Sequence, residues 1–214
     1  MNERRIVFWE VDAQEDFMLP GGKLYVPGAE KIIPNIQRLV KAAADAGVLL
    51  VSSGDAHAAG DPEFEIFPPH CLRGTPGGRI IPEGMAGDFY TIPNDSSFQI
   101  PGDILTHPQI VIEKQTLDVF DNPHAGALIE KLDRDAEYIV FGVVTEYCVS
   151  CAAKGLLQRG CQVSIVKDAI ESLAPAEAGQ NTLNELRAFG AKMISTDEAV
   201  AKSKETRAKK TSGQ

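Results

Sequence analysis

Short apolar runs alternate along the chain with segments in which apolar residues recur at helical spacing. The runs are rich in β-branched and aromatic residues, which is typical of buried strands. They lie at residues 6–11, 48–51, 109–112, 137–141, 162–166 and 192–195. Helical spacing predicts helices over residues 32–43, 122–132, 149–157 and 175–189.

This alternation predicts an α/β fold. Each strand–helix–strand unit crosses over in the right-handed sense and places its two strands parallel to each other. The expected fold class is therefore a doubly wound, mostly parallel sheet with helices on both faces, a Rossmann-like arrangement of three layers. No internal repeat or second domain is visible, so residues 1–202 are expected to form a single domain.

Two segments lack the alternating pattern. Residues 58–108 are rich in proline and glycine and have little periodicity, so they are expected to be irregular. The aromatic residues in this segment favour a packed and functional role over disorder. Residues 203–214 carry basic side chains without an apolar pattern, and we expect them to form a frayed tail.

Composition restricts the partners and the compartment. With 214 residues, of which 43% are hydrophobic, the chain can bury a full core. Its net charge of -9 argues against nucleic acid or an anionic membrane as partner, and no apolar run is long enough to span a membrane. Without a signal-peptide pattern, the four cysteines are expected to be reduced thiols of a cytoplasmic protein.

Three predicted strands carry reactive side chains at their carboxyl ends, namely Asp12, Lys114 and Cys148. In a doubly wound sheet these ends meet along one edge. Cys148 also opens a predicted helix, whose free N–H groups and dipole stabilise a thiolate and a neighbouring oxyanion. A carboxylate can take the thiol proton and return it to a leaving group, and a lysine beside them favours the ionised forms. Each residue alone has an ordinary structural explanation, but together they predict a nucleophilic cysteine.

A second group of residues has the spacing of metal ligands. In Asp55-Ala-His57 the two polar side chains are two positions apart, so in an extended segment they point the same way. Glu63 and His70 follow in the irregular segment, and Cys71 is a rival ligand beside His70. Two imidazoles with one or two carboxylates suit zinc, iron or manganese, with positions left open for water or substrate.

These residues stand in motifs that resemble those of the isochorismatase-like cysteine hydrolases, most closely the nicotinamidases (nicotinamidase/pyrazinamidase). The resemblance extends over most of the chain. The motifs are Asp12-Ala-Gln-Glu-Asp-Phe17, Asp55-Ala-His57, Pro68-Pro-His-Cys-Leu-Arg-Gly-Thr-Pro-Gly77, Glu113-Lys114 and Gly142-Val-Val-Thr-Glu-Tyr-Cys-Val149. The Asp, Lys and Cys positions indicate the superfamily, and the metal motif indicates the nicotinamidases within it.

The resemblance implies an isochorismatase-like fold and a cysteine amidohydrolase that converts nicotinamide to nicotinate and ammonia, a step of NAD salvage. Cys148 would attack the carboxamide carbon to form a thioester, and Asp12 would carry the proton. Lys114 would hold both groups in their ionised state. The backbone N–H groups of Val144 and Cys148 would form the oxyanion hole, and the Val143–Val144 peptide would be cis.

The resemblance also implies one divalent metal ion, zinc in the first place, with iron or manganese as alternatives. Four residues match the ligand positions of the family: Asp55, His57, His70 and, at the position that varies among relatives, Glu63. Phe17 and Phe67 match the aromatic walls around the substrate ring. The chain departs from common relatives at two of these positions, since the fourth ligand is often His and Phe67 replaces a Trp.

Other functions stay open at this stage. Another Cys-dependent amide or carbamoyl hydrolase of the same fold would use the same nucleophile on a different small-molecule amide. A metal-free vinyl-ether hydrolase of the isochorismatase type would not need Cys148. A non-catalytic member would bind a ligand only, and a Cys148 that is alkylated no faster than Cys151 or Cys161 would favour it. Self-association as a homo-oligomer is equally open.

Overall fold

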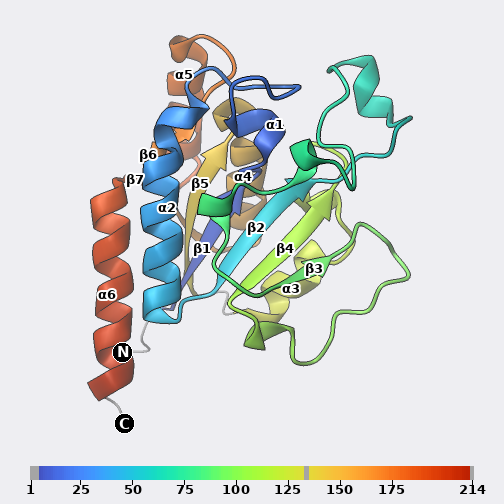
Figure 1. Cartoon of the computed structure of the whole chain (residues 1–214). Coiled ribbons are helices and arrows are strands. Elements are labelled where there is room, and N and C mark those ends of the chain that lie inside the picture. Colours follow the sequence, from blue (N-terminus) through green and yellow to red (C-terminus); the bar gives the residue numbers. More distant parts are fainter. Residues whose placement is uncertain (1–4, 133–134, 213–214) are drawn as a thin grey trace.

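The computed structural model describes residues 5–132 and 135–212 (Figure 1). Within these residues the centre of the molecule is a seven-stranded sheet in the order β3-β4-β2-β1-β5-β6-β7, and all neighbouring strands are parallel. The strands are β1 (Ile6–Val11), β2 (Leu50–Asp55), β3 (Phe89–Ile92), β4 (Gln109–Lys114), β5 (Glu137–Val143), β6 (Gln162–Glu171) and β7 (Lys192–Ile194). The α/β fold class predicted from the sequence is confirmed.

Helices cover both faces of this sheet. On one face α2 (Ala29–Ala46) and α6 (Thr196–Ser212) lie side by side, and Arg38 of α2 pairs with Asp197 of α6 (Figure 1). On the other face lie α3 (Ala125–Lys131), α4 (Ser150–Gln158) and α5 (Ala176–Ala188). A short helix, α1 (Glu15–Met18), follows β1. None of the helices in the described part of the chain is long and apolar enough to cross a membrane.

The central strand β1 separates two hydrophobic cores. Trp9 and Val11 belong to the core beneath α3 and α4, whereas Phe8 belongs to the core beneath α2. Successive side chains of a strand point to opposite faces, and all six residues of β1 are buried. Such burial on both faces is expected of a parallel strand in the middle of an α/β sheet.

Residues 58–108 are less irregular than the sequence predicts, because they contain the edge strand β3. This strand has four residues and pairs with β4 alone. Phe89 is exposed while Ile92 is buried, so β3 lacks the clear alternation that identifies a strand from sequence. Tertiary pairing, rather than local pattern, sets its conformation.

The frayed tail predicted for residues 203–214 is wrong for residues 203–212, which continue helix α6. Ser203 is buried, and the Lys202 amine lies 2.8 Å from the Glu137 carboxylate. Contacts with the body of the protein therefore support a helix whose own sequence has no amphipathic pattern. Residues 213–214 of the predicted tail and residues 1–4 of the predicted domain lie outside the described residues.

Candidate active site

Four neighbouring strands end at one edge of the sheet, and each brings a polar side chain there. Lys114 ends β4 and Asp55 ends β2, where the two residues are register partners. Asp12 follows β1, and Cys148 lies in the turn after β5. The sheet order β4-β2-β1-β5 places these ends next to one another. The convergence predicted for Asp12, Lys114 and Cys148 is thus present in the fold.

Lys114 is the centre of this group. Its amine lies 2.9 Å from Asp12 Oδ2, donates to Cys148 Sγ at 3.5 Å and pairs with Asp55 Oδ1. Asp12 Oδ1 also accepts a hydrogen bond of 2.7 Å from Ser53 Oγ. All five residues are buried, so these charges interact with little screening by solvent. One ammonium group therefore holds two carboxylates and a thiol together.

Burial and charge act against each other on these groups. For Lys114, burial alone would lower the pKa, but Asp12 and Asp55 outweigh it and raise the pKa well above its ordinary value. For Cys148, burial raises the pKa well above its ordinary value although Lys114 acts to lower it, and Asp12 adds to the rise. Lys114 thus lowers the pKa of the thiol, as expected, but burial outweighs it. A protonated Cys148 needs a base, and Asp12 is the carboxylate that contacts the same amine.

Cys148 lies in a tight turn rather than in a regular helix. The Val143–Val144 peptide is cis, as the resemblance implies, and Thr145–Val149 forms one π-helical turn before α4 begins at Ser150. Within the described part of the chain the Val144 N–H has no acceptor. This N–H and the thiol are therefore on the same turn, at the end of β5.

Beside this group lies a cluster of metal-ligand type. Asp55, His57 and His70 each offer one ligand atom, and these atoms lie within 4.8 Å of one another. Asp55 Oδ2 is 3.7 Å from His57 Nε2 and 3.6 Å from His70 Nε2. Both Nε2 atoms are buried without a hydrogen-bond partner among the described residues. Buried, unpaired imidazole nitrogens around a carboxylate fit a divalent metal ion such as zinc.

The outer nitrogens of both histidines face acceptors. His57 Nδ1 lies 3.0 Å from Asp61 Oδ2, and His70 Nδ1 lies 2.9 Å from the Pro68 carbonyl oxygen. Contacts of this kind fix the ring orientation of metal-binding histidines and leave Nε2 for the metal. Sequence reasoning missed Asp61, because an aspartate four residues after His57 is common without any such contact.

Two other ligand candidates lie outside the cluster of three. Glu63 Oε1 is 4.0 Å from His70 Nε2, and burial raises its pKa. Cys71, the rival ligand, directs its thiol to the Gly77 carbonyl oxygen at 3.8 Å, and burial raises its pKa as well. Glu63 is therefore close enough to serve as an additional ligand, while Cys71 is engaged elsewhere.

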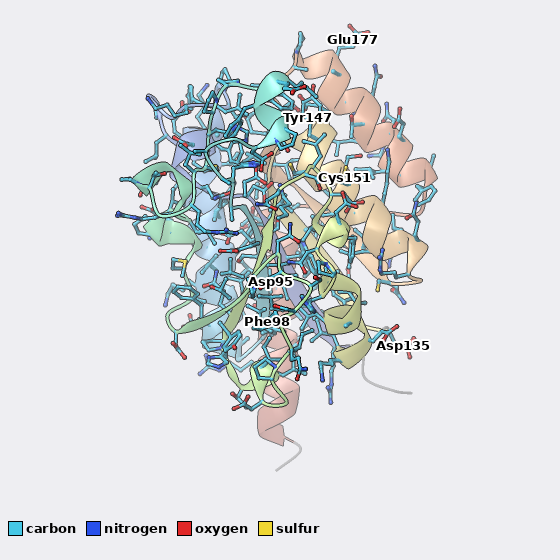
Figure 2. All side chains as sticks on the ribbon, turned by 90° about the vertical axis from the view of Figure 1, so that its right-hand side faces the viewer. Asp95, Phe98, Asp135, Tyr147, Cys151 and Glu177 are labelled. Carbon is cyan, nitrogen blue, oxygen red and sulfur yellow. The ribbon has the colours of Figure 1, made fainter. Side chains whose placement is uncertain are left out.

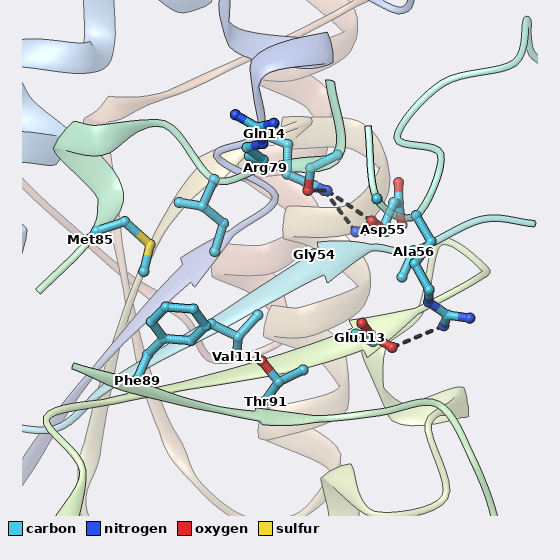
Figure 3. A pocket seen from close by; sticks show the side chains of 14 residues that line it. Gln14, Gly54, Asp55, Ala56, Arg79, Met85, Phe89, Thr91, Val111 and Glu113 are labelled. Carbon is cyan, nitrogen blue, oxygen red and sulfur yellow. Dashed lines mark hydrogen bonds and ion pairs between the residues drawn. The ribbon is translucent and has the colours of Figure 1, made fainter. Parts of the chain in front are cut away.

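Gln14 is a structural residue of this site that sequence reasoning missed. Its Nε2 donates to the Asp55 carbonyl oxygen at 2.8 Å, and its Oε1 accepts from the Asp55 N–H at 2.7 Å (Figure 3). Nε2 also donates to the Gly78 carbonyl oxygen. Gln14 thus binds both backbone groups of Asp55 and fixes the position from which its carboxylate reaches Lys114 and the histidines.

The space in front of Cys148 is narrow. Its volume is about 20 Å³, room for about one water molecule. Phe17 and Phe67, the predicted aromatic walls, both line it, and the Phe67 ring packs edge-on against Tyr147 at 6.0 Å. In Figure 2 Tyr147 lies at the upper end of the molecule, away from the loop of Asp95. Residues that sequence reasoning did not single out complete the lining: Leu24, Leu117, Tyr147 and Leu173.

Comparisons with known proteins agree with this geometry. The model of the isochorismatase domain matches residues 7–89 and 101–198. The crystal structure of the pyrazinamidase of Pyrococcus horikoshii in complex with zinc is 26% identical, with a TM-score of 0.71 over 89% of this chain and 99% of that one. No curated protein matches the chain.

Two further solved structures share the fold at lower identity. The pyrazinamidase/nicotinamidase of Streptococcus mutans is 24% identical, with a TM-score of 0.70 over 88% of this chain and 99% of that one. The N-carbamoylsarcosine amidase of Thermoplasma acidophilum is 20% identical, with a TM-score of 0.70 over 90% and 97% of the two chains.

Proposed function

The chain belongs to the isochorismatase family, and we propose that it is a metal-containing cysteine amidohydrolase that converts nicotinamide to nicotinate and ammonia. The observation that carries the proposal is the position of Lys114. Its amine contacts Asp12, Cys148 and Asp55, and Asp55 belongs also to the cluster with the histidines. A thiol with a carboxylate base and a neighbouring metal-ligand cluster supports hydrolysis of a small amide at this edge of the sheet.

The first half of the proposed reaction forms a thioester. Asp12 takes the thiol proton as Cys148 Sγ attacks the carboxamide carbon, and the carbonyl oxygen becomes an oxyanion. The N–H groups of Val144 and Cys148 are the proposed donors to this oxyanion. When the C–N bond breaks, Asp12 passes its proton to the departing nitrogen, which leaves as ammonia.

The second half consumes one water molecule. Asp12, again a carboxylate, takes a proton from the water as its oxygen attacks the thioester carbon. The C–S bond then breaks and Asp12 returns its proton to Cys148. Nicotinic acid leaves and loses its own proton to solvent to become nicotinate. Lys114 stays positively charged throughout, since its pKa lies well above the ordinary value, and it balances the charge that Asp12 gains and loses.

Asp55, His57 and His70 are the proposed ligands of one divalent metal ion, for which zinc is the first choice and iron or manganese the alternatives. The zinc in the pyrazinamidase of Pyrococcus horikoshii supports this choice. The ion would supply a Lewis acid next to the thiol, and Glu63 is a candidate fourth ligand. Phe17 and Phe67 would hold the flat ring of the substrate. We propose that the protein acts in the cytoplasm, in NAD salvage, where its free cysteines stay reduced.

The proposal is tested by ammonia and nicotinate release from nicotinamide by the purified protein. The key variant is Cys148→Ala, and Cys151→Ala is the matched control, since Cys151 lies three positions further along the chain. We expect Cys148→Ala to lower kcat/KM at least about 10³-fold and Cys151→Ala to leave it unchanged. Hydroxylamine should divert the thioester to the hydroxamate in the natural and Cys151→Ala proteins but not in the Cys148→Ala protein.

The main alternative is a related Cys-dependent amide or carbamoyl hydrolase, which would use the same Asp12, Lys114 and Cys148. Hydrolysis of N-carbamoyl amino acids without hydrolysis of nicotinamide would replace the proposed substrate and keep the cysteine mechanism. Equal activity of the Cys148→Ala and natural proteins would contradict the mechanism itself.

A further inference from the structure

A second hollow, separate from the space at Cys148, lies over strands β2, β4 and β3 (Figure 3). Its volume is about 360 Å³, much larger than that of the catalytic space. Asp55 is the one residue that lines both. In Figure 1, α2 lies toward the β6 side of the sheet, and β2, β4 and β3 continue toward the other edge. The lining of the hollow comes from these strands and from residues between Arg73 and Met85.

The floor of this hollow is apolar. Gly54 of β2 contributes no side chain and is covered by the amide of Gln14, and Val111 of β4 is only half-buried. Phe89 of the edge strand is 47% exposed, and Met85 completes this side. Figure 3 shows Phe89 and Met85 together at one side of the hollow. A ligand with an apolar body would remove this surface from water, which is favourable in proportion to the area buried.

The charged residues that line the hollow are two arginines, Arg73 and Arg79, and two acids, Glu113 and Asp55. Arg73 is paired with Glu113, whose Oε2 lies 2.9 Å from its guanidinium. Arg79 also lines the hollow, and its guanidinium has neither an ion pair nor a hydrogen bond within residues 5–132 and 135–212. The Asp55 carboxylate is engaged with Lys114. One guanidinium without a partner remains, in a protein whose net charge is -9.

We propose that this hollow binds a small amphiphilic monocarboxylate, an aryl-alkyl or short acyl acid. Its apolar body would lie on Phe89, Val111 and Met85, and its carboxylate would pair with Arg79. A guanidinium can donate two parallel hydrogen bonds to a carboxylate, and the charge of one unpaired guanidinium balances one negative charge. A dianionic phosphate would need a second free cation, whereas Arg73 is already neutralised by Glu113.

The bound acid would also touch the peptide that presents Asp55 to the catalytic site. Gly54, Asp55 and Ala56 line the hollow, as does Gln14, which binds both backbone groups of Asp55. The hollow therefore shares a wall with the catalytic site but none of its reacting atoms.

NMR of methyl-labelled protein tests the proposal without any measurement of activity, so its result does not depend on the proposed function. The probe is 4-phenylbutyrate, and the uncharged control is 4-phenylbutanol. We expect the acid to shift the methyl signals of Ile80, Met85 and Val111. The signals of Leu117 and Val144, which line the catalytic space, should stay in place.

The variant Arg79→Gln should weaken binding of 4-phenylbutyrate at least about tenfold. The natural protein should bind 4-phenylbutanol no more tightly than the Arg79→Gln protein binds 4-phenylbutyrate. The matched control is Arg187→Gln, which removes an exposed arginine on α5. Equal binding by the Arg79→Gln and Arg187→Gln proteins would overturn the proposal. So would shifts confined to the catalytic space, or an absence of shifts at millimolar acid. Shifts of the same methyl groups with protein concentration alone would assign the hollow to a second copy of the chain and overturn it too.

Discussion

Asp55 is the residue that joins the two halves of the candidate site. Its Oδ1 pairs with Lys114, and its Oδ2 faces the histidine cluster. Burial alone would raise its pKa, but Lys114 and the histidines outweigh burial and hold the pKa well below the ordinary value. A permanently ionised Asp55 fixes the Lys114 amine in place, and through it the distances to Asp12 and Cys148.

At the residue scale, Asp12 is the proposed base for the thiol. Because burial raises the pKa of Cys148, the proposed mechanism needs proton transfer to Asp12 rather than a resting thiolate. The variant Asp12→Asn keeps the size of the side chain but removes the base. We expect it to lower kcat/KM about 10³-fold and to slow alkylation of Cys148 by iodoacetamide, followed by mass spectrometry.

The control is Asp95→Asn, since Asp95 lies on an exposed loop where it accepts hydrogen bonds from Ser97 (Figure 2). In the natural protein Cys148 should be alkylated faster than Cys151, although Cys151 is more exposed. A Cys148 that reacts equally fast in the Asp12→Asn and Asp95→Asn proteins would contradict the assigned base.

Glu10 is a buried acid of β1 that the proposed mechanism does not use. Its Oε2 accepts from Ser52 Oγ at 2.8 Å, and its Oε1 has no partner within the described residues. Burial, opposed by the Ser52 hydrogen bond and assisted by the charge of Asp12, raises the pKa from 4.5 to about 8. The folded protein therefore keeps a proton that the unfolded chain releases near its ordinary pKa, so stability is lost as the pH rises from about 4.5 to about 8.

The variant Glu10→Gln keeps the shape and removes this titration. Relative to it, the free energy of unfolding of the natural protein should fall by about 3 kcal/mol between pH 5 and pH 8, measured by urea unfolding. Glu137→Gln is the control, because burial there is outweighed by Lys202 and Ser164, which lower the pKa of Glu137. Relative to Glu137→Gln, the free energy of unfolding of the natural protein should not fall between pH 5 and pH 8. Parallel pH curves for the natural and Glu10→Gln proteins would disprove a raised pKa.

The sequence predicts the reacting residues better than their supports. Asp12, Lys114 and Cys148 follow apolar strand patterns, so their convergence can be inferred from the topology of a parallel sheet. Gln14 acts through three hydrogen bonds to backbone groups distant in sequence, and Asp61 through one contact with His57. Neither spacing nor residue type distinguishes them from ordinary polar residues, and only the folded structure identifies them.

At the scale of elements, the turn after β5 is the most constrained part of the site. Gly142 lies in β5 with φ of +116°, and a Cβ built on it would lie 2.0 Å from the Val11 carbonyl oxygen. This close approach of β5 to β1 positions the turn that carries Val144 and Cys148. A side chain at residue 142 would force the two strands apart.

We therefore expect Gly142→Ala to lower the free energy of unfolding by about 3 kcal/mol or more. Gly160 is the matched control, since its φ is also positive, at +80°, but a Cβ there would have no neighbour within 4 Å. Gly160→Ala should cost only about 1 kcal/mol, the cost of the backbone conformation alone. Urea unfolding of both variants separates the cost of the steric contact with Val11 from the cost of the positive φ. Equal losses would show that the contact with Val11 is unimportant.

The elements that the sequence does not predict are those whose conformation depends on neighbours. The apolar strands β1 and β5 and the amphipathic helix α2 follow from local pattern, whereas the apolar run predicted at 48–51 covers only the first two residues of β2. The edge strand β3 forms by pairing with β4 over four residues, and the last part of α6 is helical although its sequence has no apolar stripe. Local propensity is a weak guide wherever tertiary contacts supply most of the stability.

At the scale of the whole molecule, chain topology creates the site. The sheet order brings together Asp12 and Cys148, which are more than a hundred residues apart in sequence. The sequence predicts that parallel strands joined by right-handed crossovers bring their carboxyl ends to one edge, but it does not predict the order of the strands. Nor does it predict the hollow over β2, β3 and β4, because this depends on where α2 ends and on the shape of an irregular segment.

Binding of a metal ion by Asp55, His57 and His70 should stabilise the whole fold. Asp55 ends β2, whereas His57 and His70 come from the segment that follows, so one ion would fix this segment against the sheet. A ligand that binds only the folded state adds about 3 kcal/mol at a hundredfold excess over its dissociation constant. For a chain of this length that corresponds to a rise in Tm of roughly 5–10 °C.

Zinc added to chelator-treated protein should produce this rise in a calorimetric scan, and His57→Ala should abolish it. His124→Ala is the control, since His124 faces the Asp95 carbonyl oxygen and lies outside the cluster. If zinc stabilised the His57→Ala and His124→Ala proteins equally, the ion would bind elsewhere, and the assignment of Asp55, His57 and His70 as ligands would be wrong.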